Sequence, residues 1–177
     1  MTQKESRTFV VYVEDKPGVL NRVASLFRRR AYNIVSLNVG RTHEPGVSRM
    51  TIVVESDSDM AQRFSANLYK MVNVLSVEDI TETPSVTRHL ALIKLVMKPE
   101  KRAQALEICN VFRAHVVDIA PEALIVEITG ALEKIEGFVT VLQPFGVAEI
   151  VQTGAISMKR GAEISVPKLN LGKIRAA

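Results

Sequence analysis

The sequence predicts an α+β protein built from two tandem ferredoxin-like units, each with the order β-α-β-β-α-β. Apolar residues alternate or run together over strand lengths, then recur at helical spacing, and this succession occurs twice. Between the copies, Thr83-Pro84-Ser85 breaks the pattern and is typical of a linker. We therefore expect one domain at residues 1–83 and a second at residues 84–177.

The first unit begins with a strand at Thr8–Val13 that is apolar on both faces, which predicts a central position in a sheet. A helix at Val19–Arg30 follows, because its apolar residues recur at i, i+3, i+4 and i+7. The other elements are expected as strands at Asn33–Gly40 and Arg49–Glu55, a helix at Asp59–Met71 and a strand at Val72–Thr81.

The second unit repeats this order after the linker. Its strands are expected at His89–Val96, Val116–Ala120, Leu124–Thr129 and Val147–Gln152, and its helices at Pro99–Arg113 and Ala131–Gln143. In each unit both helices lie on one face of a four-stranded antiparallel sheet. In the first unit we expect Val35, Leu37 and Val39 to make the other face partly apolar. Pairing between units or between chains would cover it, so we expect at least a homodimer built through the first unit.

Composition restricts the class of protein. No apolar run has the roughly 18 residues of a membrane helix, and the polar N-terminus does not resemble a secretory signal. The lone Cys109 has no partner for an internal disulfide, and a cytoplasmic location is expected. The formal net charge of +4 is concentrated in residues 158–177, which contain five basic residues against one glutamate. That basic tail is either a solvated end or a partner contact, and the balanced body argues against a nucleic-acid surface.

The junction Asp15-Lys16-Pro17-Gly18 is the most informative motif. Pro followed by Gly suits the central positions of a type II turn, where the second residue has positive φ. The turn leads directly into a helix whose first N–H groups lack partners and attract anions. Two interpretations are open: a small carboxylate cradle, or a simple turn in which Asp15 caps the helix.

Longer motifs narrow the choice. Asp-x-Pro-Gly-x-Leu between the first strand and helix resembles the ACT domain, a module that usually binds amino acids. The runs "PGVLNRVASLF", "RRRAYNIVSLNVG" and "GVSRMTIVV", and later "VVDIAPEALIVEITG" and "IVQTGAISMKRG", are similar to the regulatory small subunits of acetolactate synthase (acetohydroxyacid synthase). The resemblance covers the first unit almost completely and continues through the second.

This resemblance implies a regulatory subunit in branched-chain amino-acid biosynthesis. Its partner would be a separate catalytic large subunit holding thiamine diphosphate, a divalent metal such as Mg²⁺ and usually FAD, with no cofactor on this chain. That subunit would join two pyruvates, or pyruvate and 2-oxobutyrate. The small subunit would activate it and confer feedback inhibition, usually by valine. A free-standing tandem-ACT amino-acid sensor is the alternative, and co-purification of a thiamine-diphosphate enzyme separates the two.

By resemblance, the effector binds where two first units meet, between the turn of one chain and the second strand of its neighbour. The corresponding residues here are Asp15, Lys16, Pro17, Gly18, Val19, Leu20, Asn33 and Ile34. Backbone N–H groups around Gly18 and Val19 would hold the carboxylate of the effector. The Asn33 side chain, which has both a donor and an acceptor, could bind either charged end of the amino acid. Many relatives carry Asn in place of Asp15, which leaves the sensed amino acid and its affinity open. The matching loop of the second unit, Met97–Glu100, has no Pro-Gly, so no equivalent site is expected there.

Other chemistry has weaker support. His43, His89 and His115 lack metal-ligand spacing, and Cys109 lies on an apolar helix face and should be buried. Arg28-Arg29-Arg30 ends a helix, where cations favour the dipole, although a specific anion or partner contact is the alternative. An RNA-recognition module shares this element order but needs stacking aromatics that "SRMTIVVES" lacks.

Overall fold

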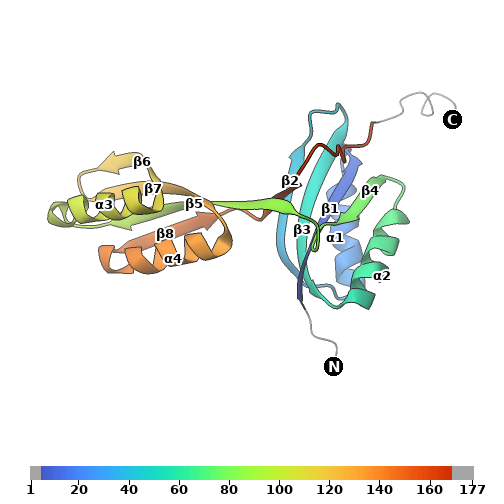
Figure 1. The fold of residues 1–177 in the computed structure, drawn as a ribbon, viewed down its shortest axis with the longest axis horizontal. Coiled ribbons are helices and arrows are strands. Elements are labelled where there is room, and N and C mark those ends of the chain that lie inside the picture. The colour runs from blue at the N-terminus through green and yellow to red at the C-terminus, as the bar shows by residue number, and fades with distance from the viewer. Residues whose placement is uncertain (1–4, 169–177) are drawn as a thin grey trace. The chain divides into compact units, whose positions relative to one another are not determined.

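The structure, a computed structural model, describes residues 5–168 and consists of two compact units (Figure 1). The first contains the described residues up to Val86 together with those from Ser157 onward, and the second spans Thr87–Ile156. The C-terminal segment thus groups with the first unit, whereas the sequence placed it with the second. Lys173 and Arg175 of the basic tail lie outside the described residues.

The first unit confirms the expected element order. It comprises β1 (Glu5–Glu14), α1 (Val19–Arg29), β2 (Ile34–Arg41), β3 (Val47–Ser56), α2 (Ser58–Tyr69) and β4 (Val74–Asp79). The antiparallel sheet has the order β2-β3-β1-β4, so β1 is central and β2 and β4 are the edges. Both helices cover the same face (Figure 1). Asp57 caps α2 by accepting a hydrogen bond of 2.8 Å from the Met60 N–H, which starts this helix earlier than predicted.

The main core lies between this sheet and its helices. Phe9, Val11 and Val13 of β1 point into it, and Phe64 of α2 fills its centre. The Phe64 ring lies 4.4 Å from the Phe9 ring, 5.1 Å from that of Phe27 and 5.4 Å from that of Tyr32, measured between centroids. These tilted and edge-to-face arrangements are the preferred geometry of packed aromatic rings.

The helix-free face of the first sheet is not bare. Val10 and Tyr12 alternate with the core residues of β1 and form a second, smaller cluster with Val47 and Ile80. Val166 of the C-terminal segment packs against this cluster. Apolar contact with the sheet is therefore the physical reason that the segment belongs to the first unit.

Strand β2 departs from the predicted alternation. Its register with β3 shifts between Ile34 and Ser36, so that a bulge separates Ile34 from Leu37. Leu37 consequently packs against the helix-side core together with Ile34. The prediction that Leu37 makes the helix-free face apolar is wrong, because a single extra residue reverses the side to which a strand residue points.

The second unit repeats this order of elements and adds two 3₁₀ turns. It contains β5 (Ser85–Val96), the 3₁₀ turn η1 (Pro99–Lys101), α3 (Arg102–Phe112), β6 (His115–Ala120), β7 (Ala123–Gly130), α4 (Leu132–Leu142), η2 (Gln143–Phe145) and β8 (Val147–Gln152). The sheet order is β6-β7-β5-β8, and β9 (Ile156–Lys159) begins at the last residue of this unit. The core is almost entirely aliphatic, with Phe138 fully buried at its centre. Among the described residues, no helix is long and apolar enough to cross a membrane.

The aromatic cluster leads to a stability prediction for the first unit. Phe64→Ala should lower the free energy of unfolding by about 3–5 kcal/mol, because a fully buried ring leaves a cavity between rigid neighbours. The chain has no tryptophan, and its three tyrosines (Tyr12, Tyr32 and Tyr69) all lie in the first unit. Urea unfolding followed by tyrosine fluorescence therefore reports this unit selectively. Val72→Ala, at a side chain that is 92% exposed, is the matched control and should shift the transition little.

Candidate functional site

The loop between β1 and α1 adopts the predicted turn. Gly18 has φ 82° and ψ −7°, the values of the second central residue of a type II turn, with Pro17 before it. The turn is closed by a bond of 3.4 Å from the Val19 N–H to the Lys16 carbonyl oxygen. A Cβ added at Gly18 would meet no atom within 4 Å, so the approach to this backbone is open within the chain. Only the positive φ requires glycine here.

Asp15 does not cap the helix. Gly18 occupies the N-cap position, and no side chain accepts a hydrogen bond from the first turn. The Asp15 carboxylate instead pairs with Arg41 Nε at 2.9 Å and accepts a hydrogen bond of 3.2 Å from the Ser48 hydroxyl. The capping interpretation is therefore wrong, and the start of α1 has its N–H groups uncapped by side chains.

Hydrogen bonding at the start of α1 leaves other N–H groups open than the sequence predicted. The first four N–H groups of a helix, here those of Gly18 to Asn21, lack partners within it, and the first helical bond runs from the Arg22 N–H to Gly18 O at 3.0 Å. Because the Val19 N–H is committed to the turn, the Leu20 and Asn21 groups are the better donors for an anion. The dipole of α1 adds to their attraction.

A polar network beneath the loop holds it in place. The Glu14 carboxylate accepts a hydrogen bond of 2.5 Å from the Asn73 side-chain amide and pairs with Lys16 at 3.0 Å. Asn73 also accepts from Arg22 Nη1 at 2.9 Å, and its backbone carbonyl accepts from the Glu14 N–H at 2.9 Å. The hydrogen bond from Asn73, followed by that from Lys16, lowers the pKa of Glu14 below its ordinary value. The end of β1, the turn and the start of α1 are thus tied to the start of β4.

The remaining predicted residues divide into two groups. Val19 is buried in the core, while the Leu20 side chain is 45% exposed beside the turn. Asn33 is exposed just before β2, and Ile34 is half-buried at the start of that strand. Among the described residues, no hydrogen bond joins Asn33 to the loop of its own chain. The turn residues thus lie together at the start of α1, whereas Asn33 and Ile34 lie just before and at the start of the edge strand β2.

The matching junction of the second unit lacks this conformation. Lys98 has φ −68° before the 3₁₀ turn, and Pro99 takes the first position of that turn. No residue of the described Met97–Glu100 junction has positive φ. The two units therefore differ in backbone geometry at the position that the sequence singled out.

The structure gives little support for a catalytic, metal or anion site at the other candidate residues. Burial raises the pKa of the Cys109 thiol, which lies in the second core, so this cysteine is a packing residue as predicted. No group of three or more potential metal ligands is present among the described residues. Arg28 and Arg29 occupy the last turn of α1, where their charge suits the helix dipole.

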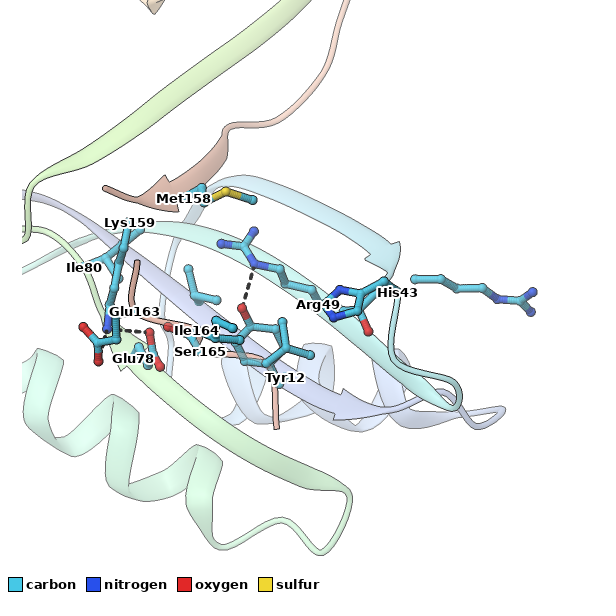
Figure 2. Close-up of a pocket in the computed structure, with 14 residues that line it drawn as sticks. Tyr12, His43, Arg49, Glu78, Ile80, Met158, Lys159, Glu163, Ile164 and Ser165 are labelled. Atoms are coloured by element: carbon cyan, nitrogen blue, oxygen red, sulfur yellow. Dashed lines mark hydrogen bonds and ion pairs between the residues drawn. The ribbon is translucent and has the colours of Figure 1, made fainter. Parts of the chain in front are cut away.

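Sequence reasoning missed one feature completely. A pocket of about 380 Å³ lies on the helix-free face of the first unit, bounded by sheet residues and by the C-terminal segment (Figure 2). The sequence feature that could have indicated this pocket is Arg49, a single cation in the apolar run "GVSRMTIVV". Arg49 is paired with Tyr12 on the neighbouring strand.

Comparison with known proteins agrees with the architecture. Residues 9–76 match the family model described as "AHAS small subunit-like ACT domain", and residues 88–161 match "Small subunit of acetolactate synthase". A probable acetolactate synthase small subunit of Archaeoglobus fulgidus is 45% identical over 87% of this chain and 96% of its own length. The acetolactate synthase small subunit of Mycolicibacterium smegmatis is 47% identical over 88% of this chain and 92% of its own length. A solved acetolactate synthase small subunit from Thermotoga maritima superposes with a TM-score of 0.83 at 35% identity, covering 90% of this chain and 99% of that one.

The fold and the glycine turn, with these matches, place the chain among ACT-domain proteins. More specifically, the chain belongs to the family of acetolactate synthase small subunits. This membership supports a regulatory role in the enzyme rather than catalysis.

The network beneath the loop predicts a specific pH dependence. Because the folded-state pKa of Glu14 is lowered, its stabilising contribution is present above the ordinary glutamate pKa and is lost as the pH falls through the lower folded value. Wild type should therefore unfold at a higher temperature than Glu14→Gln near neutral pH, and the difference should vanish in acid. Thermal unfolding by tyrosine fluorescence between about pH 3 and pH 7 measures this. Exposed Glu82→Gln is the control, and an equal pH trend in both variants would contradict the prediction.

Proposed function

We propose that this chain is the regulatory small subunit that activates the catalytic large subunit of acetolactate synthase and makes it sensitive to valine. The large subunit, carrying thiamine diphosphate, Mg²⁺ and FAD, would convert two pyruvates to 2-acetolactate and CO₂. The observation that carries the proposal is the Gly18 turn in a chain of this family: no side chain caps the start of α1, and the space beside Gly18 is open. Family membership favours this role over that of a free-standing sensor.

The chemistry of the loop suits an amino-acid effector. The Leu20 and Asn21 N–H groups would hold the carboxylate, with help from the helix dipole. The exposed Leu20 side chain provides an apolar surface for a branched side chain. The effector's ammonium group would compete with Arg41 for Asp15, and since the Arg41 side chain is 85% exposed, their ion pair is weak and displacing it costs little.

A second copy of the chain would complete the site. Strand β2 is an edge of the sheet next to β3, and an edge strand can pair with a strand of another chain. Val35 and Val39 on this strand are 54% and 41% exposed, which adds apolar area to such an interface. We propose a homodimer through this region, in which Asn33 and Ile34 of one chain approach the Gly18 turn of the other. The first domain would then bind effector and dimerise, while the second would be needed for full activation or full feedback control.

Substitution of the glycine tests the cradle. Gly18→Asp should abolish valine inhibition and leave activation largely intact. Its carboxylate would lie where the effector's carboxylate binds, and like charges about 4 Å apart repel by about 4 kcal/mol at an effective dielectric of about 20. Even half of this repulsion weakens binding about thirtyfold.

Gly18→Ala is the matched control, because it adds the backbone strain of about 1–2 kcal/mol without the charge. The measurement is a valine titration of enzyme reconstituted with each variant. Wild-type inhibition by the Asp variant would refute the site.

Mixing two defective variants tests whether the site is shared between chains. Asn33→Ala should weaken valine binding by about 1–3 kcal/mol if a buried partner loses its hydrogen bond. In a heterodimer of Gly18→Asp and Asn33→Ala chains, one site carries both defects and the other carries neither. Valine binding absent from each homodimer at a chosen concentration should therefore return in the mixture, as measured by calorimetry. If the two residues act within one chain, no intact site forms and mixing restores nothing.

A further inference from the structure

The C-terminal segment crosses the helix-free face of the first unit through several independent contacts. Lys159 Nζ pairs with the Glu78 carboxylate on β4 at 2.9 Å, and the Arg160 N–H donates to the Pro84 carbonyl at 2.9 Å. Further along, Val166 packs on the cluster around Val10 and Tyr12. Hydrogen bonding to Glu78 raises the pKa of Lys159, which keeps the ammonium group charged. Polar and apolar contacts together hold this segment over the sheet.

Between the segment and the sheet lies the pocket of about 380 Å³, at the lower end of the size range of small-molecule sites. The lining combines apolar side chains with a few polar ones: Val10, Tyr12, Arg41, Thr42, His43, Arg49, Glu78, Ile80, Met158, Lys159, Glu163, Ile164, Ser165 and Val166. Figure 2 shows Lys159 directed toward Glu78 and Glu163 at one end, and Arg49 and His43 away from that ion pair. The charges in the pocket are thus separated along its length.

Arg49 is the cation that this arrangement leaves without a countercharge. Its Nε donates to the Tyr12 hydroxyl at 3.3 Å, its Nη1 to the Thr51 hydroxyl at 2.8 Å, and its Nη2 to the Ser157 carbonyl. The guanidinium carbon lies 5.8 Å from the centre of the Tyr12 ring. These partners are all neutral, and no carboxylate among the described residues pairs with Arg49. By contrast, Glu78 and Glu163 already interact with Lys159.

We propose that this pocket binds a small amphipathic organic anion at a site distinct from the effector loop, with Arg41 as a residue that lines the pocket and also pairs with Asp15 of the loop. The anionic end would pair with Arg49, whose fixed fork retains donors that suit a carboxylate. The apolar body would lie against Tyr12, Ile80 and Ile164. Because Ile164 belongs to the C-terminal segment and Tyr12 to the sheet, the ligand would contact both.

The test is calorimetry on the full chain with three carboxylates of this shape: hexanoate, 4-methylpentanoate and phenylacetate. At least one should bind saturably, while inorganic phosphate and the neutral 4-methylpentan-1-ol should bind at least tenfold more weakly. Arg49→Gln should weaken the binding at least tenfold, and Lys94→Gln, at a half-buried cation of the second unit, should leave it unchanged.

Tyrosine-fluorescence unfolding checks that the Arg49 variant still holds its fold. If it does not, Met158→Ala, at a side chain that is 70% exposed, removes part of the pocket wall instead and should weaken binding severalfold.

The same titrations in the presence of saturating valine, and with Gly18→Asp, separate this site from the effector loop. Binding should persist in both cases, so a failure of the proposed valine site would not affect this result. The proposal is overturned if none of the three carboxylates binds, if the alcohol binds as well as the acid, or if valine abolishes the binding.

Discussion

The double-sided burial of β1 is the constraint on which the first unit depends. Phe9, Val11 and Val13 require cover on one face of the sheet, and Val10 and Tyr12 require it on the other. The two helices satisfy the first requirement, as in any ferredoxin-like unit. The second is met by Val47 and Ile80 and by Val166, which lies more than 140 positions further along the chain, in the segment after Ser157. The covering of β1 thus makes the first unit discontinuous in sequence and creates the pocket between segment and sheet.

The same strand determines the candidate effector loop. Where β1 ends, Glu14 is tied to Asn73 and Lys16, so the chain leaves the sheet in a fixed direction. Gly18 then allows the backbone to turn through positive φ into α1 without a side chain on the approach. Because Asp15 is drawn sideways to Arg41 and Ser48, it does not occupy the first N–H groups of the helix. An uncapped helix start within a braced loop is what an anion-binding cradle requires.

Local patterns predicted the element order because each unit's apolar residues follow the period of the structure they form. The turn at Gly18 was predictable for the same reason, since type II geometry restricts the residue type at one position. The bulge at Ile34 was not, because it depends on how β2 aligns with β3 and leaves no mark in a period-two pattern. Asp15 interacts with Arg41 and Ser48, and Val166 packs on the cluster around Val10 and Tyr12. Both interactions join residues that are distant in the sequence, so local patterns could not predict them.

The second unit has the same fold without the features that distinguish the first. There β5 also buries one face, with Ala91, Ile93 and Leu95 in the core, but Lys94 on its other face pairs with Glu149 at 3.5 Å. Beside this pair, Leu92 and Val96 are 37% and 52% exposed, so this face is more open to solvent than the face around Tyr12, which is 4% exposed. Its first junction also begins with Pro99 in a 3₁₀ turn, without positive φ. The alternating residues of the central strand therefore account for why the pocket lies in the first unit, and the residue types at the two junctions account for why the first has the turn with positive φ.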